Sequence, residues 1–242
     1  GLGTGVSLMG NGAKSGEDYS KDPSLLSIRL YMGGQISEHL KVEFNTEMDT
    51  NLVRVLDAVA KYELNDYFNV WAGRFLPPSD RSNLSGPYYG NVWDFPFVQN
   101  YPAIFAGRDD GIALWGKIKG GLLKYQIGAF KGLRGPSNHK DAPLMSGRLT
   151  INLWDAEPGY YNSSTYYGSQ DVLALGFVGM YQSDALGNED IRGDLLSWSV
   201  DFLMEKNLGD AGVPTLEAAF YSYGANGISP ENANSLEGTG YF

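Results

Sequence analysis

The side chains best placed to do chemistry in this sequence are charged groups that recur at every second position. The clearest case is segment 41–49 (KVEFNTEMD), where five polar side chains point to one side of an extended chain and four less polar ones to the other. A row of charged groups in register requires water on its side of the strand. The chemistry that such a row offers is electrostatic selection of an ion or polar solute in a narrow aqueous passage.

Alternation assigns further charged side chains to the water-facing side of neighbouring strands. The full set is Arg29, Lys41, Glu43, Glu47, Asp49, Asp57, Lys61, Arg74, Lys124, Arg148, Asp201, Glu205 and Glu217. Acidic and basic groups are about balanced in this set, which favours weak rather than strong selectivity. The same charges could instead be salt-bridged wall residues with no effect on permeation.

The sequence offers no motif for covalent catalysis, a metal or a cofactor. It has no cysteine, and neither of its two histidines, His39 and His139, has metal-ligand spacing around it. It has no nucleophile elbow and no phosphate-binding loop, and its glycine-rich residues 1–5 lack the strand-to-helix context of a dinucleotide site. The adjacent Asp109 and Asp110 would face opposite sides of a strand, so they are not a catalytic pair. We therefore expect no enzyme activity, no metal and no cofactor.

Composition narrows the class of protein further. No stretch approaches the roughly 18 consecutive apolar residues that a membrane-spanning helix needs, so a helical membrane protein is excluded. The formal net charge of -10 argues against nucleic acid as a partner, because nucleic acids are bound through an excess of lysine and arginine.

Period-two alternation continues along most of the chain and predicts strands throughout. Leu196, Trp198 and Phe202, for example, share an apolar face that is too large for a solvated sheet. The predicted strands are residues 4–10, 25–35, 40–49, 53–64, 68–75, 110–118, 122–131, 146–153, 171–182, 195–205 and 215–223, and a twelfth begins near Gly238. Most have about the 9–11 residues that a tilted strand needs to cross a bilayer, rather than the usual 5–6. We predict an all-β fold, a single transmembrane antiparallel β-barrel domain over residues 1–242.

The predicted connections alternate between short and long. Tight turns at residues 37–40, 65–67 and 119–121 face long connections rich in Gly, Pro, Asn and Ser, which is the arrangement of outer-membrane barrels. Connection 49–53 is too short for a long loop, and segment 155–170 is too long for a turn. The tyrosines of that segment suit either an interfacial aromatic belt or a turn packed by its own rings. They are Tyr160, Tyr161, Tyr166 and Tyr167.

Four segments, in this order and spacing, resemble the phosphate-selective porin O/P family of 16-stranded outer-membrane barrels. They are residues 28–44, residues 57–58, VWAGRFLPP at 70–78 and GRDDGI at 107–112. The likeness covers roughly the first half of the chain. It implies a trimeric, water-filled channel with a constriction formed partly by the loop after the fifth strand. Phosphate selectivity is not implied, because this sequence lacks a dense ladder of inward arginines and lysines.

The longest connection, residues 76–108, follows the fifth predicted strand, so strand counting and the resemblance select the same constriction loop. The residues that we expect to shape the constriction and its field are Arg74, Asp80, Arg81, Arg108, Lys41, Glu43 and Glu47. The three arginines flank the loop and could make it locally positive.

The strand count falls short of the number that the resemblance implies. We therefore expect the chain to be the N-terminal two-thirds to three-quarters of a longer protein, because an open barrel would expose unpaired strand edges to lipid. The alternative is a complete 12-stranded barrel that ends in Tyr241 and Phe242.

The functional hypothesis is an outer-membrane porin, general or weakly selective, for passive diffusion of small hydrophilic solutes or ions. Its partners would be outer-membrane lipid and, by resemblance alone, two further copies in a homotrimer. One alternative is a structural outer-membrane barrel with a plugged lumen that sheathes or anchors an electron-transfer protein or a surface filament. Another is a secreted glycan-binding β-protein, in which the apolar strand faces would pack on each other.

Overall fold

The computed structural model describes residues 2–12, 19–48, 52–86, 89–91, 107–229 and 238–241. They form an all-β fold, as predicted, in one antiparallel sheet of twelve strands paired in sequence order. The strands are β1 (Leu2–Gly12), β2 (Tyr19–Gln35), β3 (Leu40–Met48), β4 (Val53–Glu63), β5 (Asn69–Phe75), β6 (Asp109–Ile118), β7 (Leu123–Phe130), β8 (Leu144–Asn152), β9 (Val172–Gly187), β10 (Arg192–Glu205), β11 (Thr215–Asn226) and β12 (Gly238–Tyr241). The helical elements in these ranges are α1 (Arg81–Ser85), η1 (Lys119–Gly121) and η2 (Gly209–Ala211), and none is long and apolar enough to cross a membrane.

All the strands predicted from alternation are present, and several extend beyond the predicted ends. The β9–β10 ladder continues past residue 182, where Arg192 pairs with Gly187 and the amide of Asn188 donates to the carbonyl of Ile191 at 2.8 Å. Backbone hydrogen bonds between strands do not require alternating side chains. The strands therefore continue into the polar ends of hairpins, where side-chain alternation stops and predicts the end of the strand too early.

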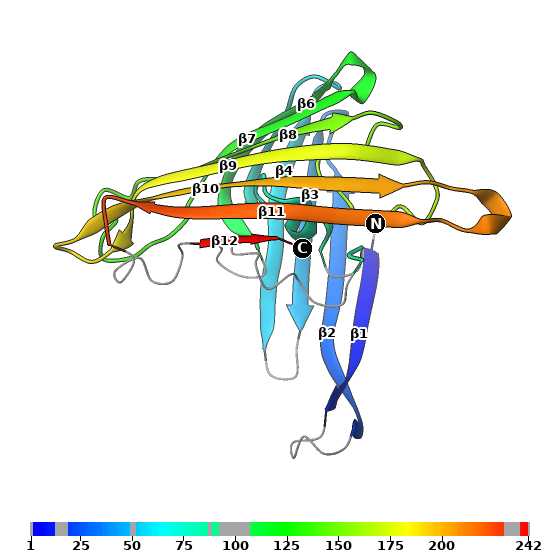
Figure 1. Cartoon of the computed structure of the whole chain (residues 1–242), viewed down its shortest axis with the longest axis horizontal. Coiled ribbons are helices and arrows are strands. Elements are labelled where there is room, and N and C mark those ends of the chain that lie inside the picture. The colour runs from blue at the N-terminus through cyan, green and yellow to red at the C-terminus, as the bar shows by residue number, and fades with distance from the viewer. Residues whose placement is uncertain are drawn as a thin grey trace.

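The sheet twists strongly and curls around an interior. In Figure 1, β1 and β2 run across the direction of β9, β10 and β11, although unbroken ladders connect them. Accumulated strand twist produces such a curl. Within the described residues, no ladder joins β12 back to β1.

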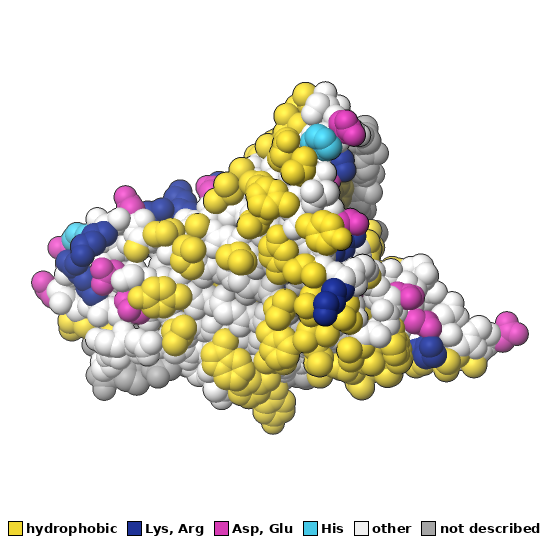
Figure 2. Space-filling view, turned by 90° about the horizontal axis from the view of Figure 1, so that it is seen from above, with side chains coloured by type: hydrophobic (Ala, Val, Ile, Leu, Met, Phe, Trp, Pro, Cys, Tyr) yellow, Lys and Arg dark blue, Asp and Glu magenta, His cyan; other side chains and the backbone are white. Residues whose placement is uncertain are grey.

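The outer face of the sheet exposes large apolar side chains. They include Val42, Phe44, Met48, Val55, Ile112, Ile127, Met145, Leu149, Phe177, Leu196, Trp198, Leu216 and Phe220. Apolar side chains cover much of the middle of the face seen in Figure 2, and most charged side chains lie toward its ends. The apolar face that alternation predicts for β10 is therefore confirmed.

The inner face buries an aromatic cluster as well as polar groups. Trp71, Phe75, Trp115 and Phe130 point inward from β5, β6 and β7, and Tyr160 packs among them. The rings of Trp71 and Tyr160 are stacked with centroids 4.5 Å apart. The core thus lies inside the curl, where connections between strands fill it.

Candidate functional site

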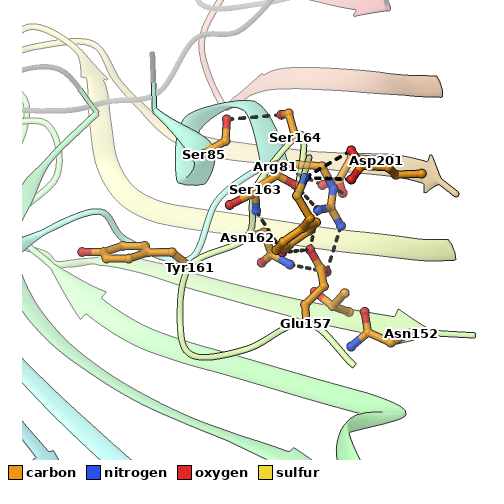
Figure 3. A network of polar contacts seen from close by, with 12 residues as sticks. Arg81, Ser85, Asn152, Glu157, Tyr161, Asn162, Ser163, Ser164 and Asp201 are labelled. Carbon is orange, nitrogen blue, oxygen red and sulfur yellow. Dashed lines mark hydrogen bonds and ion pairs between the residues drawn. The ribbon is translucent and has the colours of Figure 1, made fainter. Parts of the chain in front are cut away.

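Two connections fold into the interior and meet there. Residues 76–86 follow β5 and contain α1, whereas residues 153–171 follow β8. In a sheet of sequential antiparallel strands the fifth and eighth run in opposite directions, so the two connections start from opposite ends of the sheet. The hydroxyls of Ser85 and Ser164, 3.2 Å apart, join them (Figure 3).

The sequence stabilises α1 locally at both ends. The Asp80 carboxylate accepts the Asn83 amide at 3.1 Å, as an N-cap aspartate does. Gly86 follows the helix at φ 66, a backbone conformation that favours glycine. Asp80 also accepts the hydroxyl of Tyr221 from β11 at 3.0 Å, which fixes α1 against the wall.

Arg81 is the centre of a fully buried ion network. Its guanidinium donates to the two Glu157 oxygens at 2.5 and 3.0 Å and to the Ser163 carbonyl at 2.6 Å. Its Nε lies 3.5 Å from Asp201. The side chains of Arg81 and Glu157 are both 0% exposed. Neither ion is hydrated, so each is stabilised by the charge of the other in place of water.

Glu157 stays ionised in this buried position. Burial alone would raise its pKa, but the charge and hydrogen bonds of Arg81 lower the pKa from 4.5 to about 2. Asn162 Nδ2 at 2.5 Å and the Tyr166 hydroxyl at 2.6 Å also donate to the carboxylate. Burial opposes the charge on Arg81 too, yet Glu157 and then Asp201 keep its pKa raised.

A second ion pair connects this network to the wall. Arg148 of β8 and Asp201 of β10 meet across β9, with Nη2 and Oδ1 2.8 Å apart. Arg148 also donates to the Ser79 carbonyl at 3.1 Å, and Asp201 accepts the Arg81 amide at 3.2 Å. Gly176 of β9 lies beneath the pair, where a Cβ would collide with both side chains. Only glycine leaves the space that this pair occupies.

Two further wall acids hold residues 153–171. Glu205 accepts the backbone amides of Tyr166 at 3.0 Å and Gly168 at 2.9 Å. Glu217 accepts the Ser164 hydroxyl at 2.9 Å. Both acids point inward, as alternation predicts, but each binds an inserted segment.

The tyrosines of this segment divide between the two alternatives that the sequence left open. Tyr160 is buried, its ring lies 5.2 Å from that of Tyr161, and Tyr166 binds Glu157. Tyr167, in contrast, is 70% exposed. Three of the four therefore belong to a turn packed inside the sheet.

A cavity of about 290 Å³ lies where the inserted segments face β2, β3 and β4. Its lining residues are Arg29, Tyr31, Glu43, Asn45, Asp57, Lys61, Leu76, Leu84, Ser85, Gly86, Tyr89, Arg108, Tyr161, Asn162 and Ser163. The described residues therefore form a polar hollow beside a closed ion network.

The cations of the cavity wall are each paired with a carboxylate. Arg29 Nη2 lies 2.8 Å from Glu47, and Arg108 Nε lies 3.3 Å from Asp57. Lys61 pairs with Glu43.

Lys61 makes one further contact at this wall. Its ammonium lies 3.9 Å from the centroid of the Trp71 ring, a cation–π contact. The cavity therefore combines many charges with little net charge.

Six of the seven predicted constriction residues face the interior, five of them in two separate places. Asp80 and Arg81 belong to the buried network, whereas Glu43, Glu47 and Arg108 lie around the cavity. The sixth, Lys41, lies apart from both places. Its ammonium pairs with Glu63 at 2.6 Å, and its side chain is 45% exposed.

The prediction that Arg74 points into the lumen is wrong. Arg74 lies opposite Ala58 and Asp110 and pairs with Asp110 at 2.7 Å on the outer face. Its strand neighbours Trp71 and Phe75 are the residues that point inward. Both faces of β5 are apolar enough that alternation does not distinguish them, and the inner face is decided by aromatic packing against Tyr160.

The charges of the three arginines do not support the expectation of a locally positive constriction. Arg74, Arg81 and Arg108 each have a carboxylate partner, so none contributes an uncompensated positive charge.

Sequence reasoning missed Glu157 and Asn162, which come from a connection without periodicity. One signal was available: Glu157 is the only charged residue between Asp155 and Asp171, in a segment already too long for a turn. A single charge in a tyrosine-rich connection indicates a buried partner, because an uncompensated charge would not be retained inside.

Comparisons with known proteins add little to this description. No protein-family model and no curated protein matches the chain. A solved structure of OmpTΔL8, a loop L8 deletion mutant of OmpT, an outer membrane protein of Vibrio cholerae, is similar at a TM-score of 0.42 and 9% identity, over 93% of this chain and 84% of that chain. This likeness is too low to carry an argument, and membership of the phosphate-selective porin O/P family stays a prediction.

Proposed function

We propose that the chain forms the wall and inner filling of an outer-membrane barrel through which small hydrophilic solutes or ions diffuse passively. The channel is general or weakly selective. The observation that carries this proposal is how the side chains are divided between the two faces of the sheet. Large apolar residues lie on the outer face, and charged residues lie on the inner face.

The outer face supports a lipid environment. Phe44 on β3, Phe177 on β9 and Trp198 on β10 are all exposed and lie on strands of 9 to 16 residues. Contiguous apolar patches on soluble proteins rarely exceed a few hundred square ångströms. A hydrocarbon solvent accounts for a whole sheet face of this kind. A secreted glycan-binding β-protein is disfavoured, because its apolar faces would pack on each other.

The inner face supports an aqueous passage narrowed by inserted segments. Residues 76–86 and 153–171 occupy part of the interior, and the cavity beside them is lined by paired charges and amides. Balanced charge in a confined polar space favours weak ion selectivity. Lipid contact and assembly as a homotrimer are part of this proposal.

A structural barrel is the second candidate, and one observation favours it. The two inserted segments are fastened to each other and to the wall by fully buried ions, Arg81 and Glu157 among them. A filled lumen of this kind would suit a scaffold that holds a partner without conducting.

Single-channel recording separates the two candidates. The purified protein is first tested for membrane flotation and for a band shift between unheated and heated SDS samples, which reports a folded barrel. Stepwise, ohmic conductance in a planar bilayer supports the porin. A heat-modifiable protein that never conducts overturns it and favours the scaffold.

A further inference from the structure

The ion pairs of the cavity wall do not expose their two charges equally. The side chain of Glu43 is 29% exposed, whereas that of its partner Lys61 is 11% exposed. Glu47 is likewise more exposed than its partner Arg29. Each pair has little net charge, but the charge that is more accessible to water is the carboxylate. A solute beside these pairs therefore meets the negative partner first.

Aromatic rings cover the ammonium of Lys61. It lies 3.9 Å from the centroid of the Trp71 ring and 5.9 Å from that of Tyr161. The face of an aromatic ring attracts a cation and takes the place of water around it. These contacts explain why the positive partner is the less accessible half of the pair with Glu43.

The strand pairing around Glu43 leaves its carboxylate accessible. The residue opposite it on β2 is Gly33, which has no side chain to cover the carboxylate. Lys61 donates to Oε2, and the Asn45 amide nitrogen donates to Oε1 at 3.0 Å. Because each carboxylate oxygen has two lone pairs, these two donors leave acceptor capacity on both oxygens. Glu43 lines the cavity, so a hydrated cation or an ammonium group in the cavity can use this capacity.

The other charged residues of the lining do not offset Glu43. Arg108 and Asp57 pair with each other, and their side chains are 8% and 3% exposed. Arg29 is 7% exposed. Among the charged residues that the structure places in the lining, Glu43 therefore has the most accessible side chain.

We propose that the cavity favours small cations over anions and that Glu43 sets this preference. A cation that enters the cavity is attracted by the accessible carboxylate, whereas an anion is repelled by it before it reaches the covered cations. The favoured solutes are small hydrophilic cations, such as alkali metal ions and ammonium compounds. This inference rests on the proposed function, because a preference of the cavity selects solutes only if they pass through the interior.

The first test measures the field at the cavity without transport. The sequence has no cysteine, so a Tyr89→Cys variant carries a single thiol, whose rates of reaction with a cationic and an anionic methanethiosulfonate are measured in detergent. Tyr89 lines the cavity and is half-exposed. Both rates are divided by those of Tyr67→Cys, because Tyr67 is exposed on the β4–β5 turn and does not line the cavity. We expect the normalised cationic rate to exceed the normalised anionic rate.

Neutralising Glu43 should reduce this difference. Glu43→Gln, added to Tyr89→Cys, should lower the ratio of cationic to anionic rate roughly 2- to 5-fold, the scale of one unit charge acting through water over several ångströms. Glutamine keeps an oxygen that can accept from Lys61, and the heat-dependent band shift reports whether the barrel still folds. Asp110→Asn is the matched control, because it removes the same charge from the outer face and should leave the ratio unchanged.

The second test is the reversal potential of the conducting protein in a potassium chloride gradient. The wild type should prefer potassium over chloride, and Glu43→Gln should reduce the permeability ratio by a similar factor. If Glu43→Gln does not fold, the sign of the preference in Tyr89→Cys and in the wild type still decides the inference.

The outcomes separate this inference from the proposed function. A normalised ratio at or below one, no reaction of Tyr89→Cys with either reagent, equal ratios with and without Glu43→Gln, or a preference for chloride in the bilayer overturns the cation preference, even though the protein conducts. A ratio above one that falls in Glu43→Gln supports the preference even in a protein that is silent in a bilayer, and then only the channel proposal fails.

Discussion

The ion network around Arg81 and the cavity around Arg108 lie in the same interior but differ in closure. Both pair arginine with a carboxylate, Glu157 in one case and Asp57 in the other. The network is covered from both ends of the sheet, and its charges have no contact with water. The cavity is a hollow of about 290 Å³ beside the same inserted segments. Pairing with a carboxylate therefore sets the local net charge in both places. Whether an inserted segment covers the ion pair decides if the pair is purely structural or borders space that a solute can enter.

The largest effect should come from breaking the closed network. Glu157→Ala leaves Arg81 buried without its main countercharge, and we expect a loss of about 3–5 kcal/mol in the free energy of unfolding. Urea unfolding of the protein in detergent measures it. Asp66→Ala, which removes the partner of Lys117 at an exposed turn, is the control and should cost no more than about 1 kcal/mol. Equal losses would show that the network is not closed.

The next effect is the pH dependence of the same network. The pKa of Glu157 is lowered from 4.5 to about 2 in the folded state, so its charged form stabilises the fold. This contribution is fully present above about pH 4.5 and is lost as pH falls toward 2. Thermal unfolding across this range should show the gap between wild type and Glu157→Gln shrinking toward acid. A gap that widened toward acid would contradict the assignment.

A smaller effect should follow from crowding the second ion pair. Gly176→Ala places a methyl group against Arg148 and Asp201, and we expect a loss of about 1–3 kcal/mol. Gly179→Ala on the same strand is the control, because a Cβ there meets no atom within 4 Å. The two variants are compared by urea unfolding, and indistinguishable midpoints would refute the proposed packing.

A substitution at the cavity should give the smallest change in the free energy of unfolding and the clearest change in the electrostatic field of the passage. Asp57→Asn removes the countercharge of Arg108 but keeps a side-chain oxygen that can accept its hydrogen bond, so we expect a loss of about 1–2 kcal/mol. The reversal potential in a salt gradient should shift toward anions. Asp110→Asn on the outer face should leave that potential unchanged. A shift in the control alone would place the passage elsewhere.

The sequence predicts the wall of this fold far better than its filling. Alternation identifies β3 and β10 because one face of each meets an apolar surrounding and the other a polar interior. It does not resolve β5, where Val70 and Ala72 alternate with Trp71 and Phe75 and both faces are apolar.

The network at Arg81 was only half predictable. Loop position places Arg81 in the interior and alternation places Asp201 there, but Glu157 lies in a segment with no period. Its partner is 76 residues away in sequence, and no local pattern records a contact of that range.

The two inserted segments also impose an order on folding. Hairpin ladders of the wall close between neighbouring strands, whereas Arg81 reaches Glu157 across 76 residues and Asp201 across 120. Contacts of long sequence separation form late, because their loop-closure entropy is recovered only after the intervening chain is ordered. We therefore expect the wall to assemble before the two segments dock inside it.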